Sequence, residues 1–92
     1  MTNITIQEGQ MVAVGDSKIL LDYADFNSRK SFVHYTWLGQ DDIAPVQTTL
    51  HVGQQVELMP QVKLTLSKLI RRQSLFVELE FSAPTDISIV PV

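Results

Sequence analysis

The sequence has 92 residues, of which ten are acidic and seven basic, for a formal net charge of −3 at neutral pH. That length suits one small domain, and the slightly acidic balance is not that of a dedicated nucleic-acid binder, although a local basic patch is compatible with it. The absence of cysteine excludes disulfides, thiolate metal sites and cysteine nucleophiles. With no leader-like N-terminus and no stretch near the roughly 20 apolar residues of a membrane helix, we expect a cytoplasmic protein, or one delivered by a route the sequence does not show, without membrane contact.

Apolar and polar residues alternate through most of the chain, which is typical of strands with one buried face. In chain order the alternating apolar positions are Ile4 and Ile6; Val12 and Val14; Val33, Tyr35 and Trp37; Val56 and Leu58; Val62, Leu64 and Leu66; Val77, Leu79 and Phe81; and Ile87 and Ile89. Turn-forming residues separate these runs at 8–9, 15–17, 27–28, 39–42, 52–53, 59–60 and 83–85. The pattern predicts one all-β domain over residues 1–92.

Residues 63–73 (KLTLSKLIRRQ) admit two interpretations. Leu66, Leu69 and Ile70 have the spacing of one face of a short amphipathic helix. Thr65 and the alternation before it favour a strand that ends in a basic turn. We predict the strand.

The two halves of the sequence align on each other with an offset of 44 residues. The dipeptides that start at Gly9, Phe32 and Asp42 recur at Gly53, Phe76 and Asp86, while Leu21 and Leu66 match at an offset of 45. We predict two pseudo-symmetric copies of a five-strand unit of about 44 residues, at 3–46 and 47–91, packed as one small sandwich or barrel-like domain. The alternative is a chance match between alternating segments.

Some stretches resemble a known family. They are residues 52–56 (VGQQV), 62–66 and 76–90, within which 83–89 (APTDISI) is closest, and residues 8–10 and 14–16 match more loosely. They resemble the carbon storage regulator family of small bacterial RNA-binding proteins. The resemblance implies intertwined five-stranded units, as in the family's dimers, and binding to GGA-containing messenger leaders.

The residues that would contact RNA in that family are absent. The family uses a basic pair in its first strand and a basic residue in its last strand. Here the first strands carry residues 3–5 (NIT) and 48–50 (TTL), and the last strands carry 43–45 (IAP) and 89–91 (IVP). No RNA-contact residue can therefore be transferred to this chain.

Catalytic and metal-binding residues have weak signals. His34 and His51 lie in expected strands without the further ligands that a metal site needs, so we interpret them as solvent-facing. Five aspartates are interpreted as lying in or beside turns, and the calcium-loop spacing that Asp22 and Asp25 would form with Asn27 is incomplete. These aspartates are Asp16, Asp22, Asp25, Asp41 and Asp42. We expect no enzymatic activity, no cofactor and no metal.

Two basic clusters fall at corresponding turns of the two copies. They consist of Arg29 and Lys30 in the first copy and Lys68, Arg71 and Arg72 in the second. They would bind phosphates or an acidic partner, or else serve as solvated hairpin tips that oppose aggregation. Phe32 and Phe76 flank the clusters, either as exposed contact anchors or as members of the shared core.

The sequence favours a non-catalytic protein-interaction module: a small accessory, assembly or regulatory protein that acts by surface contact with a protein partner. The alternative is a divergent RNA-binding post-transcriptional regulator that uses the basic turns. Edge strands leave oligomerisation open as well.

Overall fold

The computed structural model describes residues 1–27, 29–39 and 44–92. These residues form strands and no helix, which confirms the all-β prediction. The described strands are β1 (Thr2–Ile6), β2 (Met11–Val14), β3 (Ser17–Asp25), β4 (Phe32–Leu38), β5 (Val46–His51), β6 (Gln55–Met59), β7 (Val62–Arg71), β8 (Leu75–Ser82) and β9 (Ile89–Pro91).

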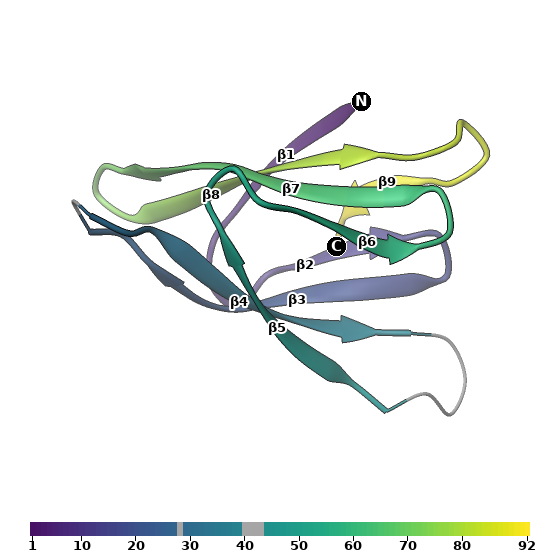
Figure 1. The fold of residues 1–92 in the computed structure, drawn as a ribbon, viewed down its shortest axis with the longest axis horizontal. Helices are drawn as coiled ribbons and strands as arrows, with labels where there is room; N and C mark the ends of the chain where they lie inside the picture. Colours follow the sequence, from purple (N-terminus) through teal and green to yellow (C-terminus); the bar gives the residue numbers. More distant parts are fainter. Residues whose placement is uncertain (28, 40–43) are drawn as a thin grey trace.

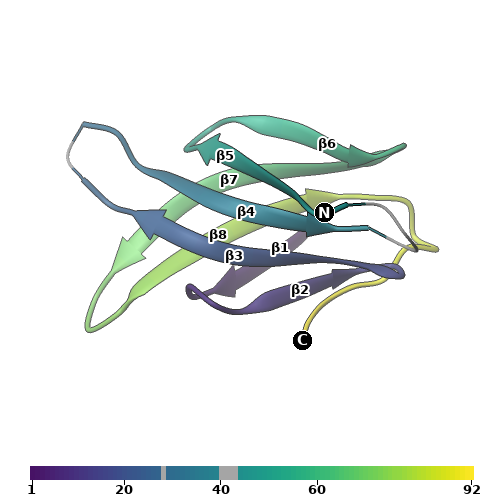
Figure 2. The same ribbon diagram turned by 90° about the horizontal axis from the view of Figure 1, so that it is seen from below.

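The strands form two antiparallel sheets that pack on each other (Figures 1 and 2). The four-stranded sheet has the order β1-β8-β7-β6, and the five-stranded sheet has the order β5-β4-β3-β2-β9. Alternate side chains of both sheets point inward and form one hydrophobic core. Its fully buried members include Val12, Ile19, Leu21, Val33, Leu50, Leu64, Leu66, Val77 and Phe81.

Both sheets contain strands from both halves of the chain. β1 pairs with β8, with Ile4 opposite Leu79, and β9 pairs with β2. β5, most of which belongs to the second half, pairs with β4 of the first half, and residues 39–45 join these two strands. The halves are therefore interleaved, and neither sheet is built from one half alone.

A β-bulge explains the ambiguity of residues 63–73. This segment is strand as far as Arg71, so the strand interpretation is confirmed and the helical one is wrong. The register shifts between Leu66 and Lys68, so the next buried residue after Leu66 is Leu69. A bulge inserts one residue into the alternation, and the resulting spacing of three imitates a helical face.

The last strands expected for the two predicted repeat units differ from those in the structure. Ile87 was expected in the last strand, but β9 begins at Ile89, and Ile87 lies in the preceding turn, where its N–H donates to the Pro84 carbonyl at 3.1 Å. The last strand of the first unit was expected at residues 43–45. Residue 43 lies outside the described residues, and Ala44 and Pro45 are not in a strand.

Most predicted turns lie where expected, at 8–9, 15–16, 52–53 and beside Pro60, while residues 28 and 40–42 lie outside the described ones. Gly9 and Gly53 have φ values of +85° and +84°, which favour glycine. Their N–H groups donate to the carbonyls of Leu21 and Leu66 at 2.7 and 2.8 Å. Both turns thus connect the two sheets in the same way.

Candidate functional site

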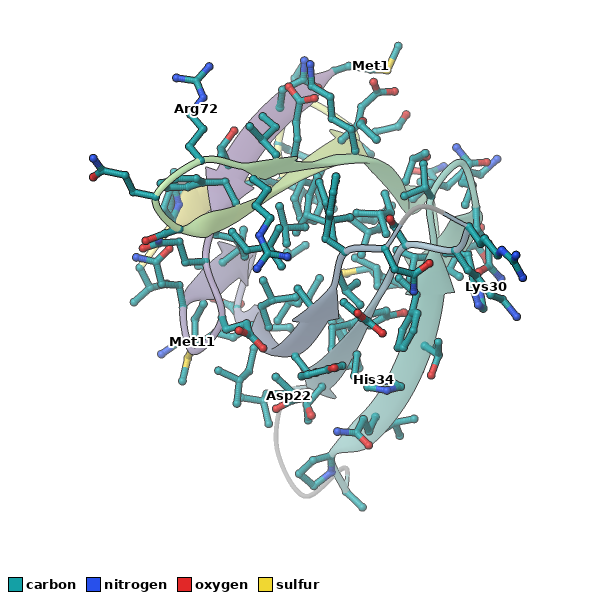
Figure 3. All side chains as sticks on the ribbon, turned by 90° about the vertical axis from the view of Figure 1, so that its left-hand side faces the viewer. Met1, Met11, Asp22, Lys30, His34 and Arg72 are labelled. Atoms are coloured by element: carbon teal, nitrogen blue, oxygen red, sulfur yellow. The ribbon has the colours of Figure 1, made fainter. Side chains whose placement is uncertain are left out.

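The basic turn residues lie at one end of the molecule but at separate corners. Arg29 and Lys30 lie between β3 and β4, where Asn27 Oδ1 accepts hydrogen bonds from both backbone N–H groups, at 2.9 and 2.7 Å. Arg72 lies between β7 and β8. Figure 3 looks onto this end and shows Lys30 and Arg72 on opposite sides of it. The two clusters do not merge into one basic surface.

Lys68 was expected in a turn, but the structure places it elsewhere. It lies within β7, opposite Glu78 on β8, and the two side chains form an ion pair with an Nζ–Oε2 distance of 3.8 Å. Arg71 is the last residue of β7. The second basic cluster therefore reduces to Arg71 and Arg72 at the hairpin tip.

Phe76 points away from the core and lines an open hollow. Its neighbour Val77 is buried, so by alternation the Phe76 ring lies on the outer side of β8, opposite Ile70. Phe76, Ile70, Thr5 and Arg72 surround a hollow of about 220 Å³. A second hollow of about 470 Å³ shares Phe76 and Arg72 with it. The ring thus forms an apolar wall beside a guanidinium group.

Phe32 is also on the outer side of its sheet, but other rings surround it. Its ring centroid lies 5.2 Å from that of His34, 5.9 Å from that of His51 and 6.2 Å from that of Tyr23. Tyr23 in turn stacks on His34 at 5.7 Å. We call these four residues, which come from β3, β4 and β5, the aromatic face.

Hydrogen bonds hold the side chains beside the aromatic face. Thr49 Oγ1 lies 2.8 Å from His34 Nδ1. Further along the same strands, Asp22 Oδ2 accepts hydrogen bonds from Thr36 Oγ1 and, at 3.3 Å, from Gln47 Nε2. These contacts run from strand to strand across β3, β4 and β5, so they restrain the outer side of the sheet as a unit.

The aspartates and histidines differ in part from their sequence interpretation. Asp22 lies within β3 on its outer side, so its assignment to a turn was wrong, whereas Asp25 ends β3 beside the next turn and Asp16 lies in a turn. Asp41 and Asp42 lie outside the described residues. His34 and His51 are half-buried among rings. Within ranges 1–27, 29–39 and 44–92, no three His, Asp or Glu residues lie together in a way that could hold a metal ion.

The aromatic face was not identified from the sequence. Its members come from three separate segments and meet because β3, β4 and β5 are neighbours, with His34 opposite Tyr23 and Thr49, and Phe32 opposite His51. Phe32 was singled out as an anchor, but nothing in the local pattern linked it to Tyr23 or the histidines. The available signal was the pair of rings Phe32 and His34 on the polar side of one expected strand, and the strand order that brings Tyr23 and His51 beside them had no sequence signal.

Among the residues that the structure describes, one ionisable side chain belongs to the core. Tyr35 is buried on the inner side of β4, opposite Thr48. Burial raises the pKa of the Tyr35 phenol, and a hydrogen bond with the Thr48 side chain partly offsets that rise. Tyr35 is therefore a neutral core residue at physiological pH.

Comparison with known proteins found no matching family model, no similar curated protein and no similar solved structure. The resemblance to the carbon storage regulator family therefore stays a prediction. In the part of the chain that the structure describes, no helix is long and apolar enough to span a membrane.

Proposed function

We propose that this chain is a non-catalytic interaction module of the cytoplasm that binds a protein partner through the aromatic face. It would serve as a small accessory, assembly or regulatory protein. The observation that carries the proposal is the continuous contact among Tyr23, Phe32, His34 and His51 on the outer side of three neighbouring strands.

The physical character of this surface suits protein binding. Aromatic side chains are enriched in the buried centres of protein interfaces, and tyrosine is among the residue types over-represented at the few positions that dominate the binding free energy. The Tyr23 side chain is well placed for this, since 45% of the residue's surface is exposed while its ring stacks on His34. Because neighbouring contacts already restrain the rings, little side-chain entropy would be lost when a partner binds.

The charges on the same side of the sheet indicate what the partner presents. Asp22 and Asp25 lie on β3 next to the rings, and Asp25 is opposite Phe32. A lysine or arginine on the partner would lie over an aromatic ring and close to a carboxylate, and both contacts favour a cation. We therefore expect a partner surface with a basic side chain among apolar ones.

The alternative function is RNA binding, and one arrangement favours it. Each basic corner has a half-buried phenylalanine near it: Phe32 follows Arg29 and Lys30, and Phe76 lines a hollow with Arg72. Rings beside cations are the elements of single-stranded nucleic-acid sites. Asp25 opposes this function at the first corner, since a carboxylate repels phosphates, and Glu78 lies two residues beyond Phe76 at the second.

The pairing of the strands supports an internal duplication, which we propose as the origin of the fold. Ile4 lies opposite Leu79, and Thr48 lies opposite Tyr35; the first members differ by 44 residues (48 − 4) and the second members by the same number (79 − 35). Interleaved halves are also what the resemblance to the carbon storage regulator family implies. A duplicated unit would make one chain from what that family assembles as a dimer.

The test compares Tyr23→Ser with Lys68→Ser. Both residues follow a bulge at equivalent places in β3 and β7 and are exposed, but Lys68 lies on the other sheet. A protein captured on the wild-type chain and then purified should bind at least about tenfold more weakly to Tyr23→Ser, as for an interface hot spot, and equally well to Lys68→Ser.

The same proteins are titrated with a GGA-bearing single-stranded RNA at low salt. We expect no complex. An RNA complex that weakens steeply with salt and is lost in an Arg29→Glu, Lys30→Glu variant would replace the proposal with the alternative. Equal partner binding by wild type and Tyr23→Ser would also refute the role of the aromatic face.

A further inference from the structure

The two sheets differ at one edge. In the five-stranded sheet, β9 lies against β2 on the side away from β3. In the four-stranded sheet, β6 takes the place that corresponds to β2, and among the described residues no strand lies on its far side. Figure 2 shows β6 as the outermost strand of its sheet.

The presence of β9 beside β2, and the lack of a described strand beside β6, go with a difference in the burial of the apolar residues of β2 and β6. Val12 lies opposite Ile19 and Val56 lies opposite Leu64, so the two valines hold the same place in their sheets. Val12 and Val14 are fully buried. Val56 and Leu58 also pack against the core but stay partly exposed. The open edge therefore leaves apolar surface that a further strand would cover.

The chain's own segment at the corresponding place is already used. With the offset of 44 residues, β9 (Ile89–Pro91) corresponds to residues 45–47. Val46 and Gln47 belong to β5, where they lie opposite Trp37 and Thr36 of β4. This pairing holds them in the other sheet, so they cannot also lie against β6.

The covered edge shows which backbone groups an added strand would use. The Gly15 N–H donates to the Ser88 carbonyl at 2.8 Å, and the Val92 N–H donates to the Met11 carbonyl at 3.0 Å. Hydrogen bonds of an antiparallel strand alternate between its two sides, so Ala13, which lies opposite Val90, also faces β9. In β6 the place of Ala13 is taken by Glu57, which lies opposite Lys63 as Ala13 lies opposite Lys18.

We propose that the open edge of β6 accepts an extended antiparallel segment of another protein, with two apolar residues that flank a lysine or arginine. The apolar residues would cover Val56 and Leu58, as Ile89 and Pro91 cover β2. The basic residue would lie beside the exposed Glu57 side chain. A second copy joined edge to edge through β6 would bring Glu57 near its own counterpart, and like charges in that position are unfavourable. Strand addition at an edge is an established mode of peptide recognition.

The test uses the chain's own covering segment as a probe. A peptide with the sequence of residues 84–92 (PTDISIVPV) and its Val90→Lys form are titrated into the full chain. We expect amide shifts and protection from hydrogen exchange at Gln55 and Glu57. We also expect the lysine peptide to bind about two- to fivefold more tightly, the effect of one cross-strand charge pair.

Two changes, one in the chain and one in the peptide, test the register of the added strand and its backbone hydrogen bonds. Glu57→Lys should reverse the order, so that a Val90→Glu peptide binds more tightly than the Val90→Lys peptide. Methylation of the peptide nitrogen at position 90 should abolish binding, because that N–H would bond to β6. The Tyr23→Ser chain should bind the peptides unchanged, which separates this edge from the aromatic face.

Three results would overturn the proposal. One is the absence of any shift at millimolar peptide. Another is a set of shifts confined to β2 and β9, which would mean exchange with the chain's own C-terminal segment. The third is a dimer in solution that protects the Gln55 and Glu57 amides without peptide, which would make a second copy the occupant.

Discussion

The outer sides of the two sheets have different chemistry, although their strands pair in the same way. The five-stranded sheet presents the aromatic face, while the four-stranded sheet presents Lys63, Lys68, Glu78 and Glu80. His34 lies opposite Thr49, and Glu78 lies opposite Thr5 at the equivalent place. The same backbone arrangement thus supports a ring cluster on one side and a charged surface on the other, so the fold alone does not decide the chemistry of either surface.

The two phenylalanines show what the difference does locally. Phe32 contacts three rings, whereas Phe76 lines an open hollow with Arg72. His51 lies beside Phe32, and its counterpart at the offset of 44 is Gln7, which has no ring. Phe32 therefore has ring neighbours on its sheet, whereas the hollow beside Phe76 is lined by Thr5, Ile70 and Arg72.

The largest loss of folding stability is expected from substitutions in the core, which lies between the two sheets. Leu21 and Leu66 are fully buried at equivalent places in β3 and β7. Leu21→Ala and Leu66→Ala should each reduce the free energy of unfolding by about 2–5 kcal/mol, because each leaves a cavity in the shared core. Denaturant unfolding followed by circular dichroism and by Trp37 fluorescence would measure the loss.

Coincident transitions from the two probes are expected in both variants. If either variant unfolded in two steps, or if one leucine had no effect, the sheets would not share a single cooperative core.

A smaller effect separates the two outer sides. Phe32→Ala should reduce the free energy of unfolding by about 1–3 kcal/mol through the loss of its ring contacts. Phe76→Ala should cost about 1 kcal/mol or less, because part of the Phe76 surface faces an open hollow. Equal losses in the same unfolding experiment would contradict the distinction between the packed and the hollow side.

Part of this comparison could be predicted from the sequence, and part could not. Period-two alternation located most strands, but the bulges between Leu21 and Tyr23 and between Leu66 and Lys68 broke the alternation. For that reason β3 had no clear pattern and β7 had a helical alternative. An inserted residue shifts the phase of the alternation, so one continuous strand looks like an interrupted or differently spaced pattern.

The candidate residues were predicted singly but not as groups. Arg29, Lys30 and Phe32 were identified, yet the contact of Phe32 with Tyr23 and His51 depends on strand neighbours that are distant in sequence. Lys68 was grouped with Arg71 and Arg72 by proximity in sequence, and pairing with Glu78 places it in the charged surface instead. Local sequence indicates chemistry, and sheet order decides which chemistries meet.

The smallest effect concerns the inner side, where Tyr35 in the five-stranded sheet corresponds to Leu79 in the other. Burial raises the Tyr35 pKa above its ordinary value of 10.0. The folded state therefore holds the phenol proton more tightly than the unfolded state does. The contribution of Tyr35 to the free energy of unfolding is fully present below about pH 10 and is lost as the pH rises through the raised pKa.

Free energies of unfolding at about pH 8 and about pH 11 should show that loss in the wild type. Tyr35→Phe should cost about 0.5–1.5 kcal/mol at the lower pH through the hydrogen bond with Thr48, and should lose less on going to the higher pH. Tyr23→Phe, which changes an exposed phenol, is the matched control and should keep the wild-type dependence. If Tyr35→Phe kept it as well, the alkaline loss would arise from other groups, and the inner sides of the two sheets would be equivalent in their response to pH.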